Sequence, residues 1–212
     1  SKFINAILRQ IDNSNIDTIN IKDLSIKYSY PKWMLEKMNI QYKKNTTISI
    51  IENDSNIPPI WIRINRLKTN SNEVSKILHE NSIDFYQDQY LDNYYKIKNF
   101  DNNNVVKELI KCGFLYIQNP SSGFVVELIN AKKNNIILDA CCAPGGKSSL
   151  IAANLNNLVQ LHCLDINTNR ITRTKNNFNR LNVKNVKFMC DNALSFNSQV
   201  KYDKILLDLP CS

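Results

Sequence analysis

Glycine is scarce in this sequence, which has four glycines among 212 residues. Two of the four, Gly145 and Gly146, are adjacent. A chain that uses so little glycine is expected to place a pair where the backbone turns sharply or where another group approaches it closely. The pair interrupts residues 136–149, where a short apolar run leads to Pro144 and then to a helical pattern. A strand, a tight turn and a helix start bring backbone N–H groups up to a ligand, so we expect a binding loop here.

Two other features are missing, and each absence excludes a class of protein. None of the six cysteines forms a C-x-x-C pair, and the chain is too long for a miniprotein held together by disulfides. No apolar run approaches the roughly 20 residues of a membrane span, and nothing resembles a signal peptide. We therefore expect a cytoplasmic protein with reduced thiols, no membrane contact and no metal ion.

Positive charge is present in excess, with 27 Lys and Arg against 19 Asp and Glu and a net charge of +8. This balance favours a polyanionic partner such as nucleic acid, but the charge is spread along the chain. Charge alone therefore supports a nucleic-acid role and an ordinary basic protein about equally. The hydrophobic content of 43% is sufficient for a packed core.

The front part of the chain alternates between helical and extended patterns. Apolar spacing predicts a helix over residues 3–11 and a helix start at Pro31. Trp33, which has lysines beside it, is expected to anchor in a core, and contact with RNA is the less common alternative. Residues 60–66 alternate as a half-exposed strand does, and Arg63 puts positive charge on that strand. We expect a small α/β module here, either an RNA-binding module or a structural support. Its further elements are a helix at 72–81 and strands at 94–97 and 114–117.

From residue 119 onward, short apolar strands alternate with helices, which predicts a parallel, doubly wound sheet. Ligands of such sheets bind beyond the carboxyl ends of the strands. Asp165, Asp191 and Asp208 each follow an apolar strand directly, and Asp139 lies within the end of another. Four carboxylates are therefore expected at the edge that carries the glycine pair. The strands are expected at 136–140, 159–164, 186–190 and 204–207, and a helix at 168–181.

The position of Asp165, 20 residues after Gly145, is typical of an acidic residue that accepts hydrogen bonds from ribose hydroxyls. Three ribose-containing ligands are candidates. A P-loop nucleotide requires a glycine where this chain has Cys141, and a dinucleotide requires a G-x-G-x-x-G pattern that is absent. S-adenosylmethionine carries no phosphate, and its sulfonium cation suits a pocket rich in carboxylates. The residues favour S-adenosylmethionine, and Asp191 is then expected near the adenine amino group.

Two motifs carry a specific resemblance to a known family. The loop C-C-A-P-G-G-K at residues 141–147 resembles the C-A-A-P-G-G-K cofactor loop of RNA (cytosine-5)-methyltransferases of the RsmB/Nop/Sun type. The stretch D-L-P-C-S at residues 208–212 resembles the D-x-P-C-S motif of that family. The segments 29–33, 58–65 and 165–167 are similar as well, so the resemblance covers essentially the whole chain. Within the family, the combination is most similar to bacterial enzymes that act on small-subunit ribosomal RNA.

The resemblance implies a fold and a domain organisation. The first four strands of a Rossmann-like, class I methyltransferase sheet are expected at 119–212, in the N-terminal part of an S-adenosylmethionine-dependent methyltransferase domain. Residues 28–118 are expected to form a small α/β RNA-binding module, and residues 1–27 the end of a NusB-like helical domain. Both ends look like cuts through a longer protein. The residues expected to bind S-adenosylmethionine are Cys141, Cys142, Ala143, Pro144, Gly145, Gly146, Lys147, Asp165, Asp191 and Asp208.

The resemblance also implies a reaction, the S-adenosylmethionine-dependent methylation of cytosine C5 in ribosomal RNA. In this family a Cys thiolate attacks C6 of an unstacked cytosine, which makes C5 nucleophilic enough to accept the methyl group. The attacking Cys lies on the strand after the D-x-P-C-S motif, so we expect it to be absent here and this chain alone to be inactive. Cys211 is expected to assist product release, with an inert thiol as the alternative. Lys147 is expected to orient the substrate or Asp208.

Two positions depart from the family pattern. Cys142 replaces the usual alanine of the loop, and residues 117–122, with Asn119 and Pro120, stand where the family often has Q-D-A-S. We expect the first change to be tolerated and the second to alter cofactor contacts slightly. A function from a different class is also compatible with the sequence, namely a non-catalytic RNA-binding remnant of such an enzyme. That alternative predicts salt-dependent RNA binding without cofactor binding.

Overall fold

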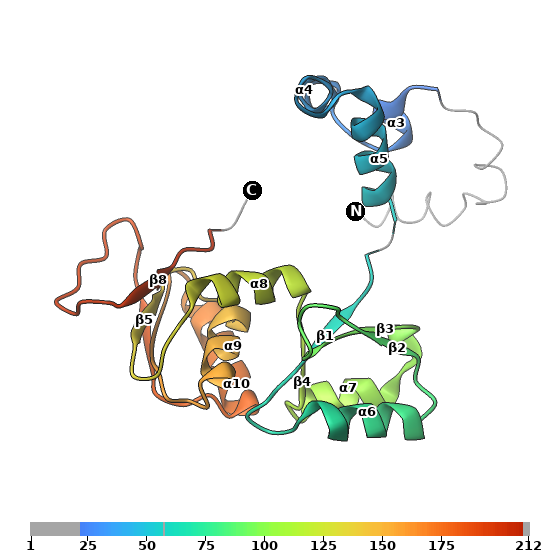
Figure 1. Cartoon of the computed structure of the whole chain (residues 1–212). Helices are drawn as coiled ribbons and strands as arrows, with labels where there is room; N and C mark the ends of the chain where they lie inside the picture. The colour runs from blue at the N-terminus through green and yellow to red at the C-terminus, as the bar shows by residue number, and fades with distance from the viewer. Residues whose placement is uncertain (1–21, 57, 210–212) are drawn as a thin grey trace, which may run out of the picture. The chain divides into compact units, whose positions relative to one another are not determined.

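The structure is a computed structural model that describes residues 22–56 and 58–209. The chain divides after Pro58 into two compact units (Figure 1). The helix predicted at residues 3–11 and the predicted assisting residue Cys211 lie outside the described residues. None of the helices in the described ranges is long and apolar enough to cross a membrane.

The described part of the first unit contains three helices. They are α3 (Leu24–Lys27), α4 (Lys32–Tyr42) and α5 (Lys44–Asp54). The helix start predicted at Pro31 is confirmed, because α4 follows this residue directly. Lys43 has a positive φ of 64° and separates α4 from α5. The phenol groups of Tyr28 and Tyr30 donate to carboxylates of α5, so the segment before α4 is held against α5.

The expectation that Trp33 anchors in a core is wrong for the described residues. Its side chain is 61% exposed, and Lys37 Nζ lies 5.6 Å from the centre of its ring. Helix α4 contributes no buried residue. Short helices bury a face only when they pack against a larger apolar surface, and the described helices of this unit provide too little of it to enclose a tryptophan.

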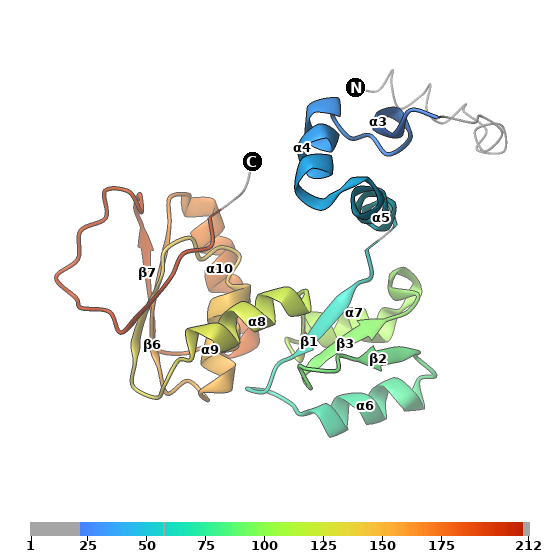
Figure 2. The same ribbon diagram turned by 45° about the horizontal axis from the view of Figure 1, so that its top comes forward.

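An antiparallel sheet with two α-helices opens the second unit. Its elements are β1 (Trp61–Ile64), α6 (Ser71–Glu80), β2 (Phe85–Gln87), β3 (Tyr94–Ile97), the 3-10 turn η1 (Phe100–Asn102), α7 (Asn104–Lys111) and β4 (Leu115–Ile117). The strand order is β2-β3-β1-β4, and both α-helices cover one face of the sheet (Figures 1 and 2). On that face, Ile62 and Ile64 of β1 pack with Val74 of α6 and Val106 of α7. The predicted strands and helix are confirmed, whereas β2 and α7 were not expected from the sequence.

The other face of β1 is not exposed, which corrects the expectation of a half-exposed strand. Arg63 lies on this face, and its side chain has no exposed surface. Trp61, two residues before it, packs against a core that includes Val126 and Ile137. Those residues belong to the second half of the unit, so the polar face of β1 is an internal interface rather than a surface.

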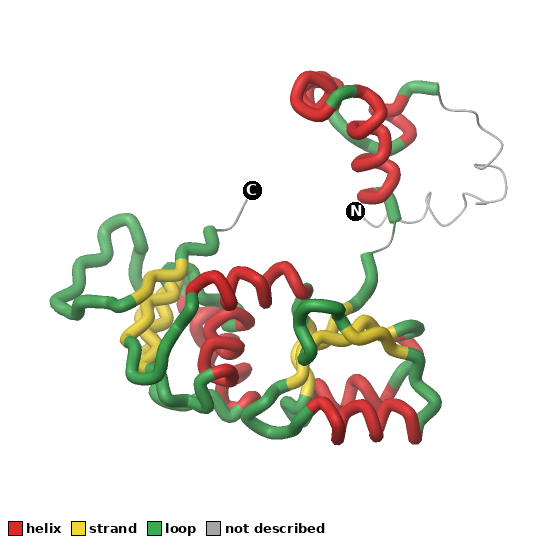
Figure 3. The backbone as a smooth tube through the Cα atoms, in the orientation of Figure 1, coloured by secondary structure: helices red, strands yellow, loops and turns green. Residues whose placement is uncertain are grey.

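Four parallel strands follow, as predicted. The elements are α8 (Pro120–Ile129), β5 (Ile136–Asp139), α9 (Gly146–Asn154), β6 (Gln160–Asp165), α10 (Thr168–Leu181), β7 (Val186–Cys190) and β8 (Lys204–Leu206). The strand order is β7-β6-β5-β8, and every pair is parallel. Figure 3 draws the strands of both sheets in yellow and the helices beside them in red. One face of the sheet packs on α9 and α10 through Leu150, Ile171 and Phe178. The opposite face is contacted by Phe196 and Tyr202 from the segment between β7 and β8.

Hydrogen bonds to backbone carbonyl groups tie the antiparallel sheet to the parallel one. Asn65 Nδ2 donates to the carbonyl oxygens of Gly113 and Leu181, at 2.8 and 2.9 Å. Arg180 of α10 donates in the other direction, to the carbonyl oxygen of Ile110. The backbones approach so closely that a Cβ at Gly113 would lie 2.1 Å from the carbonyl oxygen of Arg180. The two sheets therefore belong to one compact unit.

Candidate functional site

A cavity of about 220 Å³ opens at the carboxyl ends of β5 and β8. Its lining comes from two parts of the second unit. One part is the loop from β5 to α9 with the end of β8, whose residues the sequence predicts to bind the cofactor. The other is the passage from β4 to α8, which includes residues 117–122, where the family resemblance led us to expect altered cofactor contacts. The lining residues of the first part are Asp139, Cys141, Cys142, Ala143, Pro144, Gly146, Lys147 and Asp208, and those of the second part are Tyr116, Ile117, Gln118, Asn119 and Ser122.

The glycine pair shapes the loop between β5 and α9 in two ways. Gly145 has a φ of 96°, which residues with a side chain rarely adopt, and its N–H donates to the Cys142 carbonyl oxygen at 2.7 Å. Gly146 begins α9, and a Cβ at this position would lie 2.9 Å from Nε2 of Gln118. One glycine therefore permits the sharp turn and the other permits the close approach, which are the two uses that the sequence predicts.

Asp139 places a buried carboxylate on the cavity. Only 2% of the residue is exposed, and Oδ2 accepts a hydrogen bond from Ser148 Oγ at 2.5 Å. Oδ1 is buried and has no hydrogen-bond partner among the described residues. Burial raises the pKa of Asp139 to about 6, although the Ser148 hydrogen bond, the nearby Cys141 backbone N–H and the charge of Lys147 act in the opposite direction. An unpaired buried carboxylate oxygen is costly unless a ligand supplies a donor.

Lys147 and Asp208 form an ion pair on the same cavity. The lysine side chain is largely buried, with 18% of its surface exposed, and the aspartate side chain is 55% exposed. The role expected for Lys147, to orient the substrate or Asp208, stays a prediction. The cavity thus contains one cation next to two carboxylates, and the two carboxylates come from the neighbouring strands β5 and β8.

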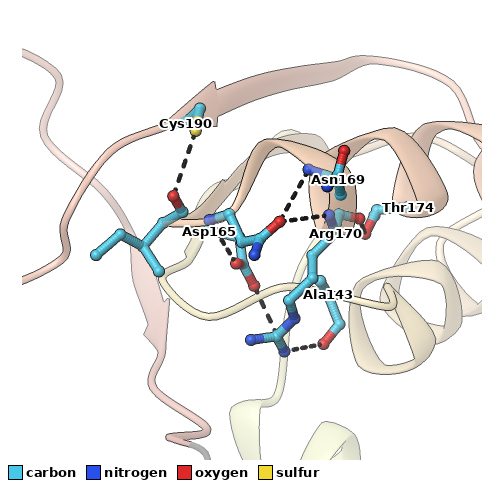
Figure 4. Close-up of polar contacts among 8 residues, drawn as sticks. Ala143, Asp165, Asn169, Arg170, Thr174 and Cys190 are labelled. Carbon is cyan, nitrogen blue, oxygen red and sulfur yellow. Dashed lines mark hydrogen bonds and ion pairs between the residues drawn. The ribbon is translucent and has the colours of Figure 1, made fainter.

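Asp165 lies beside the loop rather than on the cavity (Figure 4). It is 3% exposed, and its Oδ1 accepts a hydrogen bond from the Asn167 N–H at 3.1 Å. Oδ2 has no hydrogen-bond partner among the described residues, but it lies 3.6 Å from Nη2 of Arg170. The same Nη2 donates to the Ala143 carbonyl oxygen at 3.0 Å, so Arg170 connects the loop to Asp165.

Asp191 lies at the end of the next strand and does not line the cavity either. Its side chain is exposed, and its N–H donates to the Asp165 carbonyl oxygen at 3.3 Å. Of the four carboxylates expected at this edge, the structure therefore brings Asp139 and Asp208 together around the cavity. Asp165 and Asp191 follow in order along β6 and β7.

Arg63 reaches the site from the antiparallel sheet. It donates to Gln118 Oε1 at 2.7 Å, to the Gly146 carbonyl oxygen at 2.8 Å and to Ser149 Oγ at 2.9 Å. Complete burial lowers the pKa of the Arg63 guanidinium, and the neighbouring hydroxyl group of Tyr94 opposes this effect. One side chain thereby connects β1, the passage to α8 and the first turns of α9.

A larger hollow of about 600 Å³ lies at the other edge of the parallel sheet. It is lined by residues at the amino ends of β6 and β7, including Gln160, Val186 and Lys187. None of the residues predicted to bind a ligand lies there. Because ligands of open α/β sheets bind at the carboxyl ends of the strands, the smaller cavity is the better candidate site.

Comparison with known protein families gives two matches. Residues 126–212 match the family described as 16S rRNA methyltransferase RsmB/F, and residues 30–99 match the ferredoxin-like domain described for RsmF/B-like methyltransferases. Together the two matches cover most of the sequence. The chain belongs to the RsmB/F family. Its antiparallel sheet is the ferredoxin-like module, its parallel sheet belongs to the methyltransferase domain, and the predicted family and fold class are confirmed.

This RsmB/F chain spans about half the length of the curated relatives it matches. It is 28% identical over 214 residues to Ribosomal RNA small subunit methyltransferase B of Proteus mirabilis, with 99% of the chain and 50% of that protein covered. The protein of the same name from Shewanella oneidensis is 28% identical over 213 residues, with 100% and 49% covered. A methyltransferase homolog protein from Pyrococcus horikoshii, whose structure is solved, is 26% identical with a TM-score of 0.80, and 95% of this chain and 64% of that chain are covered. NSun6 from the same organism shares the fold at 20% identity and a TM-score of 0.74, with 85% and 71% covered.

Three residues of this RsmB/F site are not found by reasoning from the sequence. The burial of Arg63 is not visible because alternation along β1 does not say what covers its polar face. Gln118 lies within residues 117–122, where the family resemblance led us to expect altered cofactor contacts, but the sequence does not single it out because it is not acidic. Arg170 lies five positions after Asp165, and only the fold shows that its side chain turns back to the loop.

Proposed function

We propose that the protein containing this chain is an S-adenosylmethionine-dependent RNA (cytosine-5)-methyltransferase that acts on small-subunit ribosomal RNA. The observation that carries the proposal is the cavity in which the loop at residues 141–147 meets Asp139 and Asp208. The substrate class is supported by the relatives named Ribosomal RNA small subunit methyltransferase B. In this proposal the described residues provide the side of the active site that holds the methyl donor.

The residues around the cavity fit S-adenosylmethionine better than a nucleotide with phosphates. Asp139 on the cavity and Asp165 beside the loop each have one buried carboxylate oxygen without a hydrogen-bond partner among the described residues, and that of Asp165 lies 3.6 Å from Arg170 Nη2. S-adenosylmethionine offers an ammonium group, ribose hydroxyls and a sulfonium cation to such oxygens, and carboxylates would repel a triphosphate. When bound, the cofactor supplies the methyl group as an electrophile.

Each residue has a role in this proposal. Asp165 accepts hydrogen bonds from the ribose hydroxyls through Oδ2, which Arg170 faces at 3.6 Å without donating a hydrogen bond to it, and Asp191, at the neighbouring strand end, accepts from the adenine amino group. Asp208 serves both the amino-acid end of the cofactor and the target cytosine, and Lys147 fixes its orientation. Cys211, which lies outside the described residues, assists product release. The loop residues Cys141, Cys142, Ala143, Pro144, Gly145 and Gly146 enclose the donor.

The ferredoxin-like module is proposed to bind the RNA. Arg66, Lys68 and Lys98 are exposed on it, and contacts between such side chains and phosphates release counterions. RNA binding is therefore expected to weaken as salt increases. Because the target base has to leave its stack to be methylated, an RNA loop or a flipped nucleotide is the expected substrate.

Isothermal titration calorimetry tests the cofactor part of the proposal. We expect Asp165→Ala to weaken S-adenosylmethionine binding by about tenfold or more, since a hydrogen bond to a charged acceptor is lost. Asp101→Ala, the same substitution in the exposed turn η1, is the control and should bind as the unchanged chain does. Unaltered binding by Asp165→Ala would contradict the pocket assignment. Salt-dependent RNA binding without any cofactor binding would instead support the non-catalytic remnant.

A further inference from the structure

The part of the cavity that comes from β4 and α8 contains a buried amide group, that of Gln118, without an assigned role. Gln118 follows β4, lines the cavity and is only 9% exposed. Its Oε1 accepts hydrogen bonds from Arg63 Nη1 at 2.7 Å and from Tyr94 Oη at 2.9 Å. Its Nε2 makes no hydrogen bond to any residue of the described ranges. The amide oxygen therefore accepts two hydrogen bonds, and the amide nitrogen is available to donate a hydrogen bond to a ligand.

The two partners fix the orientation of the Gln118 amide. A guanidinium group only donates hydrogen bonds, so the amide oxygen and not the nitrogen has to face Arg63. Arg63 is itself immobilised, because it has no exposed surface and also donates to Gly146 and Ser149. Burial raises the pKa of Tyr94 to about 12, so the hydroxyl group keeps the proton that it donates.

The amide nitrogen of Gln118 lies at the start of α9. A Cβ at Gly146 would be 2.9 Å from Nε2 but 3.6 Å from the amide carbon, so the nitrogen is the atom that faces the helix. The first N–H groups of a helix have no acceptor within the helix, and its dipole places partial positive charge there. Lys147 adds a full positive charge on the same cavity. Donors from three sources therefore converge near the beginning of α9.

Acceptors line the same cavity. Asp139 has its buried Oδ1 free of hydrogen-bond partners within the described part of the chain, and Asp208 is more than half exposed. A ligand group in which an anion and a cation are attached to the same carbon atom matches such a set of donors and acceptors. The α-amino-acid end of S-adenosylmethionine is a zwitterion of this kind.

We propose that Gln118 binds the α-carboxylate of S-adenosylmethionine by donating a hydrogen bond from Nε2, and that Arg63 and Tyr94 are the positioning residues that aim it. The inference rests on the proposed function and adds the contact that recognises the amino-acid end of the cofactor. It also gives the ferredoxin-like module a second task, since Arg63 and Tyr94 belong to β1 and β3 of this module.

The Gln118→Glu variant tests the donor while preserving the packing. A glutamate keeps oxygen acceptors for Arg63 and Tyr94, but it has no N–H group and adds a charge that repels a carboxylate. Calorimetry on the full chain should show S-adenosylhomocysteine bound about tenfold to a hundredfold more weakly. Binding of 5′-methylthioadenosine, which lacks the amino-acid end, should change by less than about twofold.

The matched control is Gln199→Glu, the same substitution at an exposed position between β7 and β8. It should alter the binding of neither ligand. Equal weakening of both ligands by Gln118→Glu would overturn the inference, because the amide would then act only through packing. Unchanged binding of S-adenosylhomocysteine would overturn it as well. Failure of the unchanged chain to bind either ligand would contradict the proposed function, and this inference with it.

Two further variants test the positioning residues. Tyr94→Phe removes one of the two donors to Gln118, so we expect S-adenosylhomocysteine to bind about threefold to tenfold more weakly and 5′-methylthioadenosine to bind unchanged. Arg63→Lys cannot reach all three acceptors and should show the same selectivity with a larger loss. A merely structural role would reduce the binding of both ligands equally, and thermal unfolding confirms that each variant is folded before its binding is compared.

Discussion

The two sheets of the second unit contribute to one cavity in different ways. The parallel sheet supplies residues that directly follow its strands, in the loop at 141–147 and at Asp208. The antiparallel sheet acts through Arg63, from the middle of a strand, and through Gln118, just after another strand. A residue at the carboxyl end of a parallel strand can be recognised from local sequence. A residue in the middle of an antiparallel strand has a role that depends on what packs against its face.

The largest effect is expected for Arg63→Met, which tests whether the antiparallel sheet is structurally essential to the cavity. The change leaves three acceptors in or near the core without their charged donor. We expect a loss of about 3 kcal/mol or more in the free energy of unfolding, measured by urea denaturation. Arg66→Met is the control, because Arg66 pairs with Asp92 on the surface and such pairs contribute about 1 kcal/mol or less. Similar losses of stability for both variants would contradict the claim that the buried Arg63 supports the cavity more than a surface ion pair does.

Substitutions at the two adjacent glycines test the contributions of the two sheets to stability and to ligand binding within one loop. Gly145→Ala forces a side chain into a φ of 96° and places its Cβ 2.4 Å from the Phe178 ring of the parallel half. We expect a loss of about 2–3 kcal/mol of stability. Gly146→Ala presses instead on the amide nitrogen of Gln118, which lies at the end of a side chain and makes no hydrogen bond within the described residues. It should cost less than about 1 kcal/mol of stability but weaken S-adenosylhomocysteine binding about tenfold, as measured by calorimetry. Equal effects of the two variants on both quantities would contradict this assignment.

The parallel sheet could be predicted from the sequence better than the antiparallel sheet. The strands and helices from residue 136 onward are found almost to the residue, because apolar runs, the glycine pair and the strand-end aspartates are local signals. The strand β2 is short and has little pattern. The helix α7 does show helical apolar spacing, with Val106, Leu109 and Ile110 on one face, so this signal was present in the sequence and was missed. The burial of Arg63 depends on the docking of one sheet against helices of the other, and no window of the sequence contains that information.

The pH dependence of stability tests Asp139, the buried carboxylate of the parallel sheet. Its pKa in the folded chain is about 6, above the ordinary value of 3.8, so the folded state holds a proton that the unfolded state has released between these values. Stability should therefore fall by roughly 2–3 kcal/mol as the pH rises from about 4 to about 6, and the contribution should be flat above that.

The comparison variant is Asp139→Asn, which keeps an acceptor oxygen for Ser148 and cannot titrate. Urea denaturation should show equal stability of the two proteins near pH 4 and greater stability of the variant at pH 7. The same pH profile in both proteins would show that Asp139 is not the group responsible.

The smallest effect is expected for Lys147→Met. The ion pair with Asp208 is more than half exposed on the aspartate side, so solvent screening reduces its contribution. We expect a change of less than about 1 kcal/mol in the free energy of unfolding by urea denaturation. A loss as large as that of Arg63→Met would show that the parallel sheet, and not the antiparallel one, provides the main polar support of the cavity.

Hydrogen exchange on binding of S-adenosylhomocysteine tests most directly whether the two sheets share one methyl-donor pocket. Amide exchange is measured by mass spectrometry in the free and the bound chain, with 5′-methylthioadenosine as the comparison ligand. We expect S-adenosylhomocysteine to slow amide exchange both at residues 139–149 and at residues 116–122. We expect 5′-methylthioadenosine to slow exchange at residues 116–122 less than S-adenosylhomocysteine does. Protection confined to residues 139–149 with both ligands would contradict the shared pocket.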